Sequence, residues 1–467
     1  MELADVEFVT QFLLRTLAQL LDLQRADLVG ERLAGNGDVA FDLGHHFGVL
    51  RRILHGLRGA LHVHSHITGT GGGDYFPHLC FGPIGGNIVD YHRAGGYGDR
   101  RAVGQQIAEG AGAAAVGGAA AGTLATPALA QQRIEMVIVS SWGRDFPGLG
   151  TGAQRLAQKI QDTSDGRIQV QYFAAGERVG AFDAFDEVAS GNAQAYHSAD
   201  YYWKGKHPAW AYFTSVPFGL TCNEMASWIH HMGGQQLWDK LAGEYGLKCL
   251  PSGNTGVQMG GWFNKEINSA DDLKGLKMRI PGLGGQVISK LGGTTVTLPG
   301  GQIYENLVSG SIDATEWVGP YNDYFMKFYE AAKFYYTGGM HEPGGGLSFA
   351  FNASLWGSMT DWEKAVITAA AYEEQAAQYE EALAKNGEYL GKLVNEQGVV
   401  VKAFNDEVWD SFGDAAAEVF EEVRDHSALA KKIDDAFQKA LREIGGTMAK
   451  FEGTFVNQRN RVLGLEA

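Results

Sequence analysis

The sequence is short of cysteine and of positive charge. Only three cysteines occur in 467 residues, Cys80, Cys222 and Cys249, and their spacing does not match that of a structural zinc site. Lysine and arginine total 38 against 54 aspartates and glutamates, so the formal net charge is −16. This balance argues against a nucleic acid or an anionic membrane surface as a partner. An anionic ligand must therefore meet a local positive group rather than a positive field.

The sequence also lacks the common catalytic motifs. It contains no Gly-x-Ser-x-Gly nucleophile elbow, no phosphate-binding loop and no His-Glu-x-x-His zinc motif. The glycine-rich stretches 148–152 and 282–285 lack the third glycine of a dinucleotide fingerprint and indicate turns and helix caps. The pairs His230–His231 and His341–Glu342 are isolated in the sequence and indicate no metal constellation. These absences favour a binding protein over an enzyme.

Lysine and tryptophan are missing from the first part of the chain. The first lysine is Lys159 and the first tryptophan is Trp142, whereas residues 1–130 hold eight of the fourteen histidines and nine arginines. A shift this sharp indicates that two unlike sequences are joined. We interpret residues 1–98 as an extension from a mis-assigned translation start. The alternative is a genuine extension that carries a basic amphipathic segment.

The join has the pattern of a bacterial export signal. Arg100-Arg101 precede an Ala/Gly-rich tract that is free of charge after Glu109 and closes with the small-x-small site 128–130. We therefore predict a signal peptide at 99–130, cleavage after Ala130 and a periplasmic location. The paired arginines resemble the twin-arginine type, and the general secretory route stays open. Beyond residue 130 no uninterrupted run of 18 apolar residues occurs, so a membrane span is not expected.

The exported cysteines leave two alternatives open. Cys222 and Cys249 would enter an oxidising compartment, where a pair of thiols can form a disulfide. The sequence does not give the distance between them. They either pair or remain buried free thiols.

Strand and helix patterns alternate after residue 130, which predicts an α/β fold with crossover connections. A first lobe is expected at 131–254, with strands at 133–142, 167–173 and 193–203 and helices at 152–166 and 181–192. A second lobe is expected at 255–345, with strands at 260–266, 277–282, 294–300 and 311–319 and helices at 284–293 and 302–310.

The C-terminal third is predicted to cross between the lobes. Residues 346–404 would return the chain to the first lobe with the strand 346–352 and then form a long spanning helix. Thr360 and Glu363 form the capping box of this helix. Residues 405–467 are predicted to be a helical C-terminal region. Two lobes joined by crossing segments leave a cleft, and small ligands commonly bind in such clefts.

One charged residue interrupts an otherwise apolar strand. Arg279 stands between Met278 and Ile280, so its side chain faces opposite to theirs. It points either into solvent, as an ordinary edge-strand charge, or into the cleft. A guanidinium suits a small carboxylate ligand because its planar fork offers two parallel donors. The strand therefore predicts either a solvated charge or an anion-binding group.

Two segments of the second lobe carry a specific resemblance. The stretch INSADDLKGLKMRIPG (267–282) resembles the most distinctive segment of the solute receptors of tripartite ATP-independent periplasmic (TRAP) transporters. The stretches SGNTGVQMGGWF (252–263) and TEWVGPYND (315–323) resemble the 2-oxo-acid and lactate receptor branch of that family. The similarity extends over residues 131–465. It implies a two-lobed periplasmic binding protein fold with a ligand cleft between the lobes.

The resemblance implies specific roles for residues of the second lobe. Arg279 would bind the ligand carboxylate, and Gln258 would contact the ligand and coordinate a cation through its amide oxygen. Glu316 would be the charged metal ligand, and Trp317 would coordinate through its carbonyl while its indole walls the pocket. Glu342 would be a second metal ligand. The cation would be Na⁺ or Ca²⁺, since hard cations prefer oxygen ligands.

The first lobe and its border are expected to contribute fewer groups. Tyr202, with Tyr201 as the neighbouring alternative, would donate a hydroxyl to the ligand, and Asn254 is a further candidate. The structural alternatives are that Trp317 is plain core, Gln258 a hydrogen-bonded strand side chain and Glu342 a solvated loop charge.

The resemblance further implies a function and partners. The protein would capture a small 2-oxo or 2-hydroxy monocarboxylate and deliver it to the membrane subunits of a TRAP transporter, without catalysis. The C-terminal helices are exchanged between two subunits in this branch, so a homodimer is a hypothesis. The alternatives are a sensor subunit that presents the ligand to a signalling protein and a periplasmic enzyme acting on the same acids.

Overall fold

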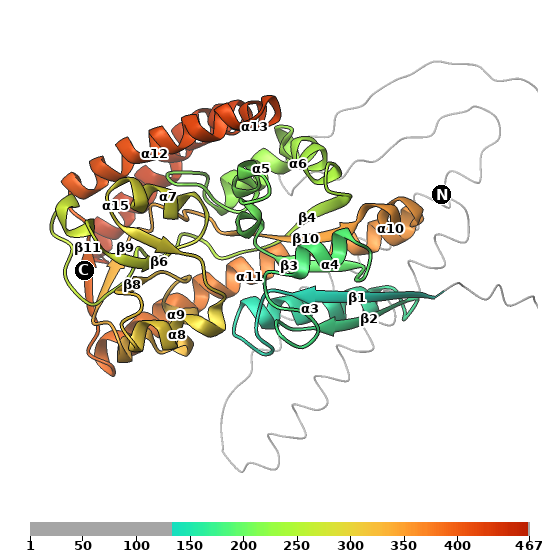
Figure 1. The fold of residues 1–467 in the computed structure, drawn as a ribbon, viewed down its shortest axis with the longest axis horizontal. Helices are drawn as coiled ribbons and strands as arrows, with labels where there is room; N and C mark the ends of the chain where they lie inside the picture. Colours follow the sequence, from blue (N-terminus) through green and yellow to red (C-terminus); the bar gives the residue numbers. More distant parts are fainter. Residues whose placement is uncertain (1–132, 466–467) are drawn as a thin grey trace, which may run out of the picture. The chain divides into compact units, whose positions relative to one another are not determined.

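The computed structural model describes residues 133–465, which form two β-sheets and the helices around them (Figure 1). The predicted residues 1–98 extension and the export signal lie outside the described residues. No helix in the described part of the chain combines the length and apolar character that a bilayer crossing needs. The expected α/β fold with two lobes is confirmed.

The first sheet has the strand order β2-β1-β3-β10-β4. Its strands are β1 (Ile134–Ser140), β2 (Ile168–Phe173), β3 (Ala195–Ser198), β4 (Leu247–Asn254) and β10 (Gly346–Asn352). β1 pairs in parallel with β2 and β3, whereas β10 runs antiparallel to β3 and β4. The strand 346–352 therefore returns the chain to the first sheet, as predicted.

The second sheet has the order β11-β9-β5-β8-β6-β7. Its strands are β5 (Gly261–Phe263), β6 (Lys277–Arg279), β7 (Thr294–Val296), β8 (Ala314–Thr315), β9 (Phe334–Thr337) and β11 (Val400–Ala403). β11 pairs in parallel with β9, so the end of the segment 346–404 joins the second sheet and not the first. The lobe boundaries at residues 254 and 345 remain a prediction, because the sheets alone do not assign the loops between them.

Helices cover both sheets. They are α3 (Leu149–Thr163), α4 (Ala184–Ala189), α5 (Cys222–His231), α6 (Gly234–Gly243), α7 (Gly282–Lys290), α8 (Gly300–Val308), α9 (Pro320–Met326) and α10 (Ala353–Ser358). Short 3₁₀ helices occupy Asp200–Trp203, Pro208–Phe213, Ala270–Leu273 and Phe328–Glu330. The first of these follows β3, where the sequence predicts that the strand within 193–203 runs into a loop, and it places Tyr201 and Tyr202 beyond the carboxyl end of β3.

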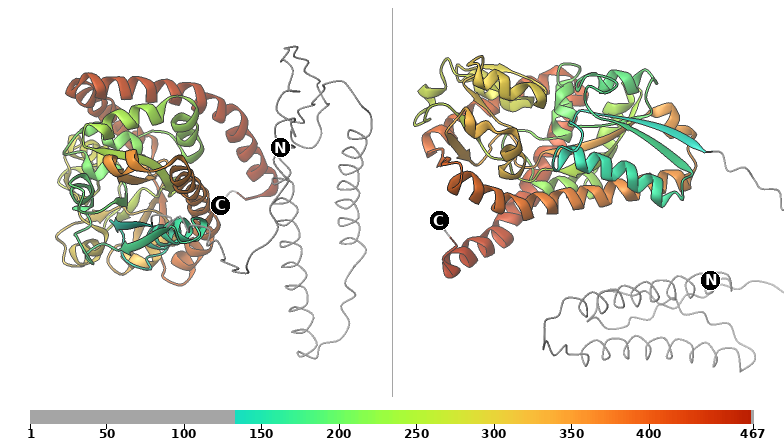
Figure 2. Two further views of the ribbon diagram at one scale, coloured as in Figure 1. Left: turned by 90° about the vertical axis from the view of Figure 1, so that its right-hand side faces the viewer. Right: turned by 90° about the horizontal axis from the view of Figure 1, so that it is seen from below.

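One long helix connects the lobes. α11 (Asp361–Asn395) has 35 residues, roughly 52 Å of helix, and packs against α3 and β4 of the first lobe and α9 of the second (Figures 1 and 2). Thr360 accepts a hydrogen bond from the Glu363 backbone N–H at 3.3 Å, and the Glu363 carboxylate accepts one from the Thr360 N–H at 2.7 Å. The predicted capping box and spanning helix are confirmed.

The C-terminal region is helical from residue 406 to residue 463, apart from Ser427. α12 (Asp406–His426) packs on α7 of the second lobe, and α13 (Ala428–Ala440) packs on α5 and α6 of the first. Two single π-helical turns, at 441–445 and 449–453, flank α14 (Gly446–Met448) and lead into α15 (Thr454–Leu463). α15 buries no residue and extends away from the rest of the described chain (Figure 2).

The two cysteines of the described region are free and buried. Cys222 begins α5 and Cys249 lies within β4. The structure therefore has buried free thiols at these two positions rather than a disulfide. Burial raises the pKa of both thiols, and that of Cys222 reaches about 12, which disfavours thiolate chemistry at neutral pH.

Candidate functional site

Arg279 ends strand β6 and is buried. β6 lies between β7 and β8, so it is not an edge strand, and 1% of the Arg279 side chain is exposed. The alternative of a solvated edge-strand charge is therefore wrong. Nε donates to the Leu298 carbonyl at 3.1 Å, and Nη1 donates to the Glu316 carbonyl at 3.1 Å and to its carboxylate at 2.5 Å. Nη2 has no hydrogen-bond partner among the described residues.

The ion pair with Glu316 keeps this arginine charged. Burial lowers the pKa of Arg279, but the Glu316 carboxylate and the neighbouring tyrosines raise it more, so the net shift is upward. A buried charge requires a partner of this kind, because desolvation of an unpaired ion costs several kcal/mol. Nη2 is thus a charged donor that is held in place without a partner among the described residues.

Three potential metal ligands meet beside this ion pair. The ligand atoms of Glu316, His341 and Glu342 all lie within 4.8 Å of one another, and all three residues are buried. His341 Nε2 lies 3.2 Å from the second carboxylate oxygen of Glu316. The interpretation of His341–Glu342 as an isolated pair is wrong, because the fold brings Glu316 to it from 25 residues away. The sequence offered no spacing signal for this group.

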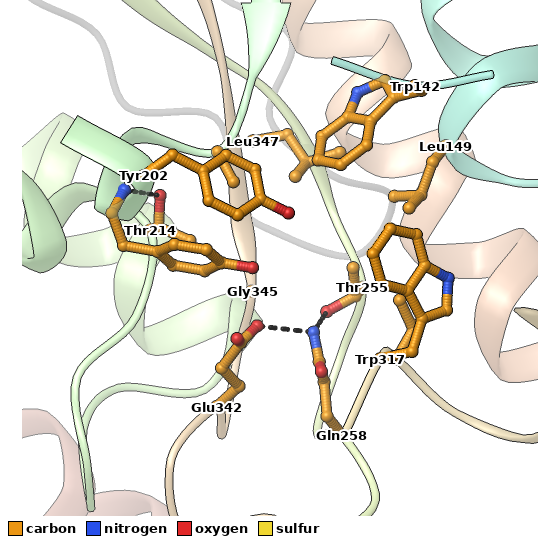
Figure 3. Close-up of a pocket in the computed structure, with 13 residues that line it drawn as sticks. Trp142, Leu149, Tyr202, Thr214, Thr255, Gln258, Trp317, Glu342, Gly345 and Leu347 are labelled. Atoms are coloured by element: carbon orange, nitrogen blue, oxygen red, sulfur yellow. Dashed lines mark hydrogen bonds between the residues drawn. The ribbon is translucent and has the colours of Figure 1, made fainter. Parts of the chain in front are cut away.

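Gln258 completes the polar end of the site. Its Nε2 donates to the Glu342 carboxylate at 2.6 Å and to Thr255 Oγ1 at 3.0 Å (Figure 3). Its Oε1 is buried without a hydrogen-bond partner in the described part of the chain. Two carboxylates and an unpaired amide oxygen form the donor set of a hard cation such as Na⁺ or Ca²⁺. The residues present therefore fit the cation that the sequence predicts.

Burial beside a second acid shifts the proton equilibrium of Glu342. Burial, and next the charge of Glu316, raise the pKa of Glu342 well above its usual range, although Arg279 and a hydrogen bond from Tyr201 oppose this. Two carboxylates in one dry site repel each other. A bound cation would relieve that repulsion.

Of these groups, Gln258 and Glu342 border a small cavity (Figure 3). Its lining comes from both lobes and consists of Trp142, Leu149, Ala199, Tyr201, Tyr202, Thr214, Thr255, Gln258, Trp317, Val318, Glu342, Gly345 and Leu347. One end is polar, and the opposite wall is formed by Trp142, Leu149, Trp317 and Leu347.

Both tyrosines of the first lobe reach the cavity. Tyr201 and Tyr202 pack edge to face with ring centroids 4.7 Å apart, and Figure 3 shows the Tyr202 hydroxyl directed into the cavity. Burial raises the pKa of both phenols above the ordinary value, so both stay neutral hydroxyl donors. Both tyrosines therefore line the cavity, and the predicted hydroxyl contact of Tyr202 with the ligand stays a prediction.

The predicted residues do not all reach the cavity. Gln258, Tyr202, Trp317 and Glu342 line it. Arg279 lies behind the wall, with its guanidinium 5.2 Å from the centre of the Trp317 ring. Glu316 is buried beside it.

Asn254 has a different contact. Its Oδ1 accepts a hydrogen bond from the Gly256 N–H at 2.8 Å and so holds the turn after β4. The residue does not line the cavity. The structure therefore gives Asn254 a structural contact, and its predicted ligand role stays a prediction.

Trp317 is the one residue of the apolar wall that the sequence predicts, and Trp142 and Leu149 were not predicted. Trp142 follows β1, and Leu149 begins α3. Trp142 meets Trp317 of the second lobe edge to face, with ring centroids 6.5 Å apart. Nothing in their spacing marks these residues as neighbours, because the contact forms across the two lobes.

A buried histidine holds Trp142 in this wall. The Trp142 indole N–H donates to His197 Nδ1 at 2.8 Å, and His197 Nε2 lies 3.2 Å from the Ser252 carbonyl. The imidazole is therefore neutral, with its proton on Nε2. Burial lowers the pKa of His197 to about 4.

We expect this histidine to make the protein less stable in acid. Because the folded pKa lies below the unfolded value of about 6.5, the stabilisation is complete above pH 6.5 and falls as the pH drops toward 4. The loss at pH 4.5 relative to pH 7.5 should be about 2 to 3 kcal/mol greater in the wild type than in His197→Gln, which keeps both hydrogen bonds but does not titrate. Urea unfolding at the two pH values measures this difference. Equal losses in the two proteins would contradict the assignment.

Gly345 keeps the polar end of the cavity open. A Cβ at this position would lie 2.6 Å from Thr255 Oγ1 and 2.9 Å from both Gln258 Nε2 and a Glu342 oxygen. We expect Gly345→Ala to displace these groups and to weaken ligand binding by roughly tenfold or more, with a stability loss of about 1 to 3 kcal/mol. Gly301→Ala, whose Cβ meets nothing within 4 Å, is the control. Calorimetric titration compares the two, and unchanged affinity in Gly345→Ala would contradict the prediction.

A charged and polar cavity enclosed between two α/β lobes defines a solute-binding protein. The chain belongs to the DctP family, the bacterial extracellular solute-binding proteins of family 7, whose sequence profile matches residues 140–426. The resemblance to TRAP solute receptors is thereby confirmed.

Individual relatives agree with this assignment. The monocarboxylate 2-oxoacid-binding periplasmic protein of Nostoc sp. is 38% identical over 307 residues, which is 66% of this chain and 84% of the relative. A TRAP solute-binding protein of Pseudoalteromonas atlantica, solved with sodium and pyruvate, has 35% identity and a TM-score of 0.68 over 70% of this chain and 99% of its own. A TRAP transporter solute-binding protein of Bordetella bronchiseptica, a dimer with calcium and picolinate in one active site, has 31% identity and a TM-score of 0.70 over 72% and 99%.

Proposed function

We propose that the protein captures a small 2-oxo or 2-hydroxy monocarboxylate, together with Na⁺ or Ca²⁺, in the cavity between its lobes. The observation that carries the proposal is the polar end of this cavity. There the Glu342 carboxylate and the unpaired Gln258 amide oxygen line the cavity opposite an apolar wall, and Glu316 and the unpartnered Nη2 of Arg279 are buried next to them. A short acid with one carboxylate and a small apolar tail matches both ends.

Arg279 would bind the ligand carboxylate through Nη2. Its Nε and Nη1 already donate to Leu298 and Glu316, so the fork cannot meet a carboxylate with both arms in this arrangement. One charge-assisted hydrogen bond contributes about 1.5 to 3 kcal/mol, less than the roughly 8 kcal/mol of micromolar binding. Other groups must supply the remainder. The Tyr202 hydroxyl is a second donor from the opposite lobe.

Glu316, Glu342, the Gln258 amide oxygen and the Trp317 carbonyl would hold the cation. When bound, the ion supplies positive charge that both the protein carboxylates and the ligand oxygens need. Without the cation, Arg279 would be the only positive group among the described residues beside Glu316, Glu342 and the ligand carboxylate. The sodium and calcium in the two solved relatives support either ion.

The relatives also support the ligand class. Pyruvate and picolinate, the ligands of the two solved proteins, are monocarboxylates with an acceptor atom beside the carboxylate, and the Nostoc protein is described as 2-oxoacid-binding. We propose that the loaded protein delivers such an acid to TRAP membrane subunits. No chemical step on the ligand is part of this proposal, so bound acid should be recovered unchanged.

The place of action follows from the same proposal. The protein would be exported by the signal at 99–130, cleaved after Ala130, and would act in the periplasm. The family of extracellular solute-binding proteins supports this location. N-terminal sequencing of the exported protein tests it, with Gln131 as the expected first residue and Met1 as the contradicting result.

Calorimetry tests the central proposal. The purified protein would be unfolded and refolded to strip any carried-over ligand and then titrated with pyruvate, 2-oxobutyrate, 2-oxovalerate and lactate, with and without Na⁺ or Ca²⁺. Tight binding that requires a cation is the expected result. No heat with any acid under either ion would overturn the proposal.

We also propose that the C-terminal helices form a homodimer. Phe451, Phe455, Val462 and Leu463 are each at least 64% exposed along the segment that leads into and through α15. Exposed apolar residues on a projecting helix indicate a protein interface. The Bordetella relative, described as a dimer, supports a second copy as the occupant.

Light scattering tests the dimer. The wild type should have twice the mass of one chain, and Phe451→Asp/Phe455→Asp should have the mass of a single chain, because buried carboxylates would oppose the contact. The same double substitution should leave acid affinity within about threefold, since it lies outside the cavity. A monomeric wild type at high concentration would remove the hypothesis.

A further inference from the structure

The carboxylate of Asp323, a residue that does not line the cavity, holds the segment that carries Glu316 and Trp317. This segment, residues 316–319, runs from β8 to the start of α9. Asp323, in the first turn of α9, turns its side chain back to it. Its Oδ1 accepts hydrogen bonds from the Val318 N–H at 3.0 Å and the Gly319 N–H at 3.1 Å.

The other oxygen of Asp323 is fixed to the second sheet. Oδ2 accepts a hydrogen bond from the Trp262 indole N–H at 3.0 Å and one from the Tyr335 hydroxyl at 2.8 Å. These residues belong to the paired strands β5 and β9, and their rings stack with centroids 4.0 Å apart. Asp323 is 1% exposed. One buried carboxylate thus joins the rigid centre of the sheet to the segment 316–319.

The segment has a second tie to the cavity. The Val318 carbonyl accepts a hydrogen bond from the Met259 N–H at 3.0 Å, next to Gln258. A shift of Val318 would therefore move both the Glu316–Trp317 side and the Gln258 side of the site. Outer residues that orient metal ligands typically change metal affinity by about 10- to 100-fold when they are removed.

We propose that Asp323 is a positioning residue that sets the cation affinity of the site by fixing residues 316–319. This inference rests on the proposed function. Asp323 does not line the cavity and does not contact the ligand, so its effect passes through the backbone of Val318 and Gly319.

Two substitutions separate positioning from ordinary stability. Asp323→Ala removes the acceptor for both backbone N–H groups. Asp323→Asn keeps one oxygen for them but turns an amide NH₂ toward the Trp262 N–H, where two donors face each other. Both variants should be less stable than the wild type. The hydrogen bonds of the Val318 and Gly319 N–H groups should be lost in Asp323→Ala and partly kept in Asp323→Asn.

A matched control lies in the C-terminal region. Asp434 on α13 is also 1% exposed, and it accepts a hydrogen bond from the Tyr212 hydroxyl at 2.7 Å and pairs with Arg424. It contacts neither the segment 316–319 nor the cavity. Asp434→Ala therefore removes a buried, tyrosine-bonded carboxylate at a comparable cost in stability.

The first measurement is the cation dependence of pyruvate binding by the whole protein. Burial raises the pKa of Asp323 to about 7, so titrations at pH 8 keep it ionised. At a fixed pyruvate concentration, the Na⁺ or Ca²⁺ concentration for half-maximal binding should rise roughly tenfold or more in Asp323→Ala. It should rise less in Asp323→Asn and stay within about threefold of the wild type in Asp434→Ala.

The second measurement needs no ligand. Hydrogen exchange of the Val318 and Gly319 amides in the cation-free protein should be faster in Asp323→Ala than in Asp434→Ala, because only the first substitution removes their acceptor. A wild-type cation midpoint or unchanged exchange in Asp323→Ala would overturn the inference alone. Absence of any cation dependence in the wild type would overturn the proposed function, and the inference with it.

Discussion

Pyruvate binding should fall roughly 100-fold or more in Arg279→Ala. The substitution removes the charged Nη2 donor and leaves Glu316 as a buried carboxylate without its partner. Loss of a charge-assisted hydrogen bond costs about 1.5 to 3 kcal/mol, and breaking a buried ion pair costs the fold about 3 to 5 kcal/mol. Calorimetric titration and urea unfolding measure the two effects separately.

Arg155→Ala is the matched control for this substitution. Arg155 forms a two-armed pair with Glu374, which is 4% exposed, and contacts Glu381, all away from the cavity. Its removal should cost stability while acid affinity stays within about threefold. The role of Arg279 would be refuted if both variants lost the same small amount of affinity.

Removal of the cation should have an effect of similar size. In choline chloride with a chelator, pyruvate affinity should be roughly 100-fold or more below that in NaCl or CaCl₂. The ligand carboxylate then lies near the buried Glu316 carboxylate, whose only arginine partner among the described residues is Arg279, and no ion offsets the repulsion. Two like charges 4 Å apart repel by about 4 kcal/mol at an effective dielectric constant of about 20.

Glu342→Gln refines this prediction. The amide has the shape of the acid without its charge, so the variant should keep binding in Na⁺ and lose most of the gain from Ca²⁺. Glu374→Gln, which changes a buried carboxylate outside the cavity, should respond to both ions as the wild type does. Equal affinity of the wild type with and without cations would contradict the assignment of these acids.

Much of the fold could be predicted from local patterns. The alternation of strands and helices, the return strand 346–352 and the Thr360 capping box depend on residues near one another in the sequence, and all three are confirmed. β4 was not predicted, because Pro251 removes a backbone donor from a strand. The structure tolerates it since β4 is the last strand of its sheet.

Site residues could be predicted where they lie within a single recognisable stretch of sequence, but contacts between distant segments could not. Gln258 and Trp317 lie in stretches that resemble the family, and the fold brings them to one cavity with Glu342. His341 was missed because its partner Glu316 lies in another strand connection. The sequence also predicts a two-armed Arg279, whereas two of its three nitrogens are occupied by Leu298 and Glu316, which no spacing reveals.

The order of strands along the chain governs when the binding site can form. In the first sheet β10 lies between β3 and β4, and in the second sheet β11 pairs with β9. Both β10 and β11 come after residue 345 in the chain, so neither sheet is complete until these residues are synthesised. Between the synthesis of β4 and that of β10 roughly 5 to 20 s elapse at ordinary rates of translation. During that interval the edges of β3 and β4 lie open to foreign strands. A chain that stops before residue 346 can complete neither sheet. Such an incomplete chain therefore cannot bind the ligand or compete for it with the full-length protein.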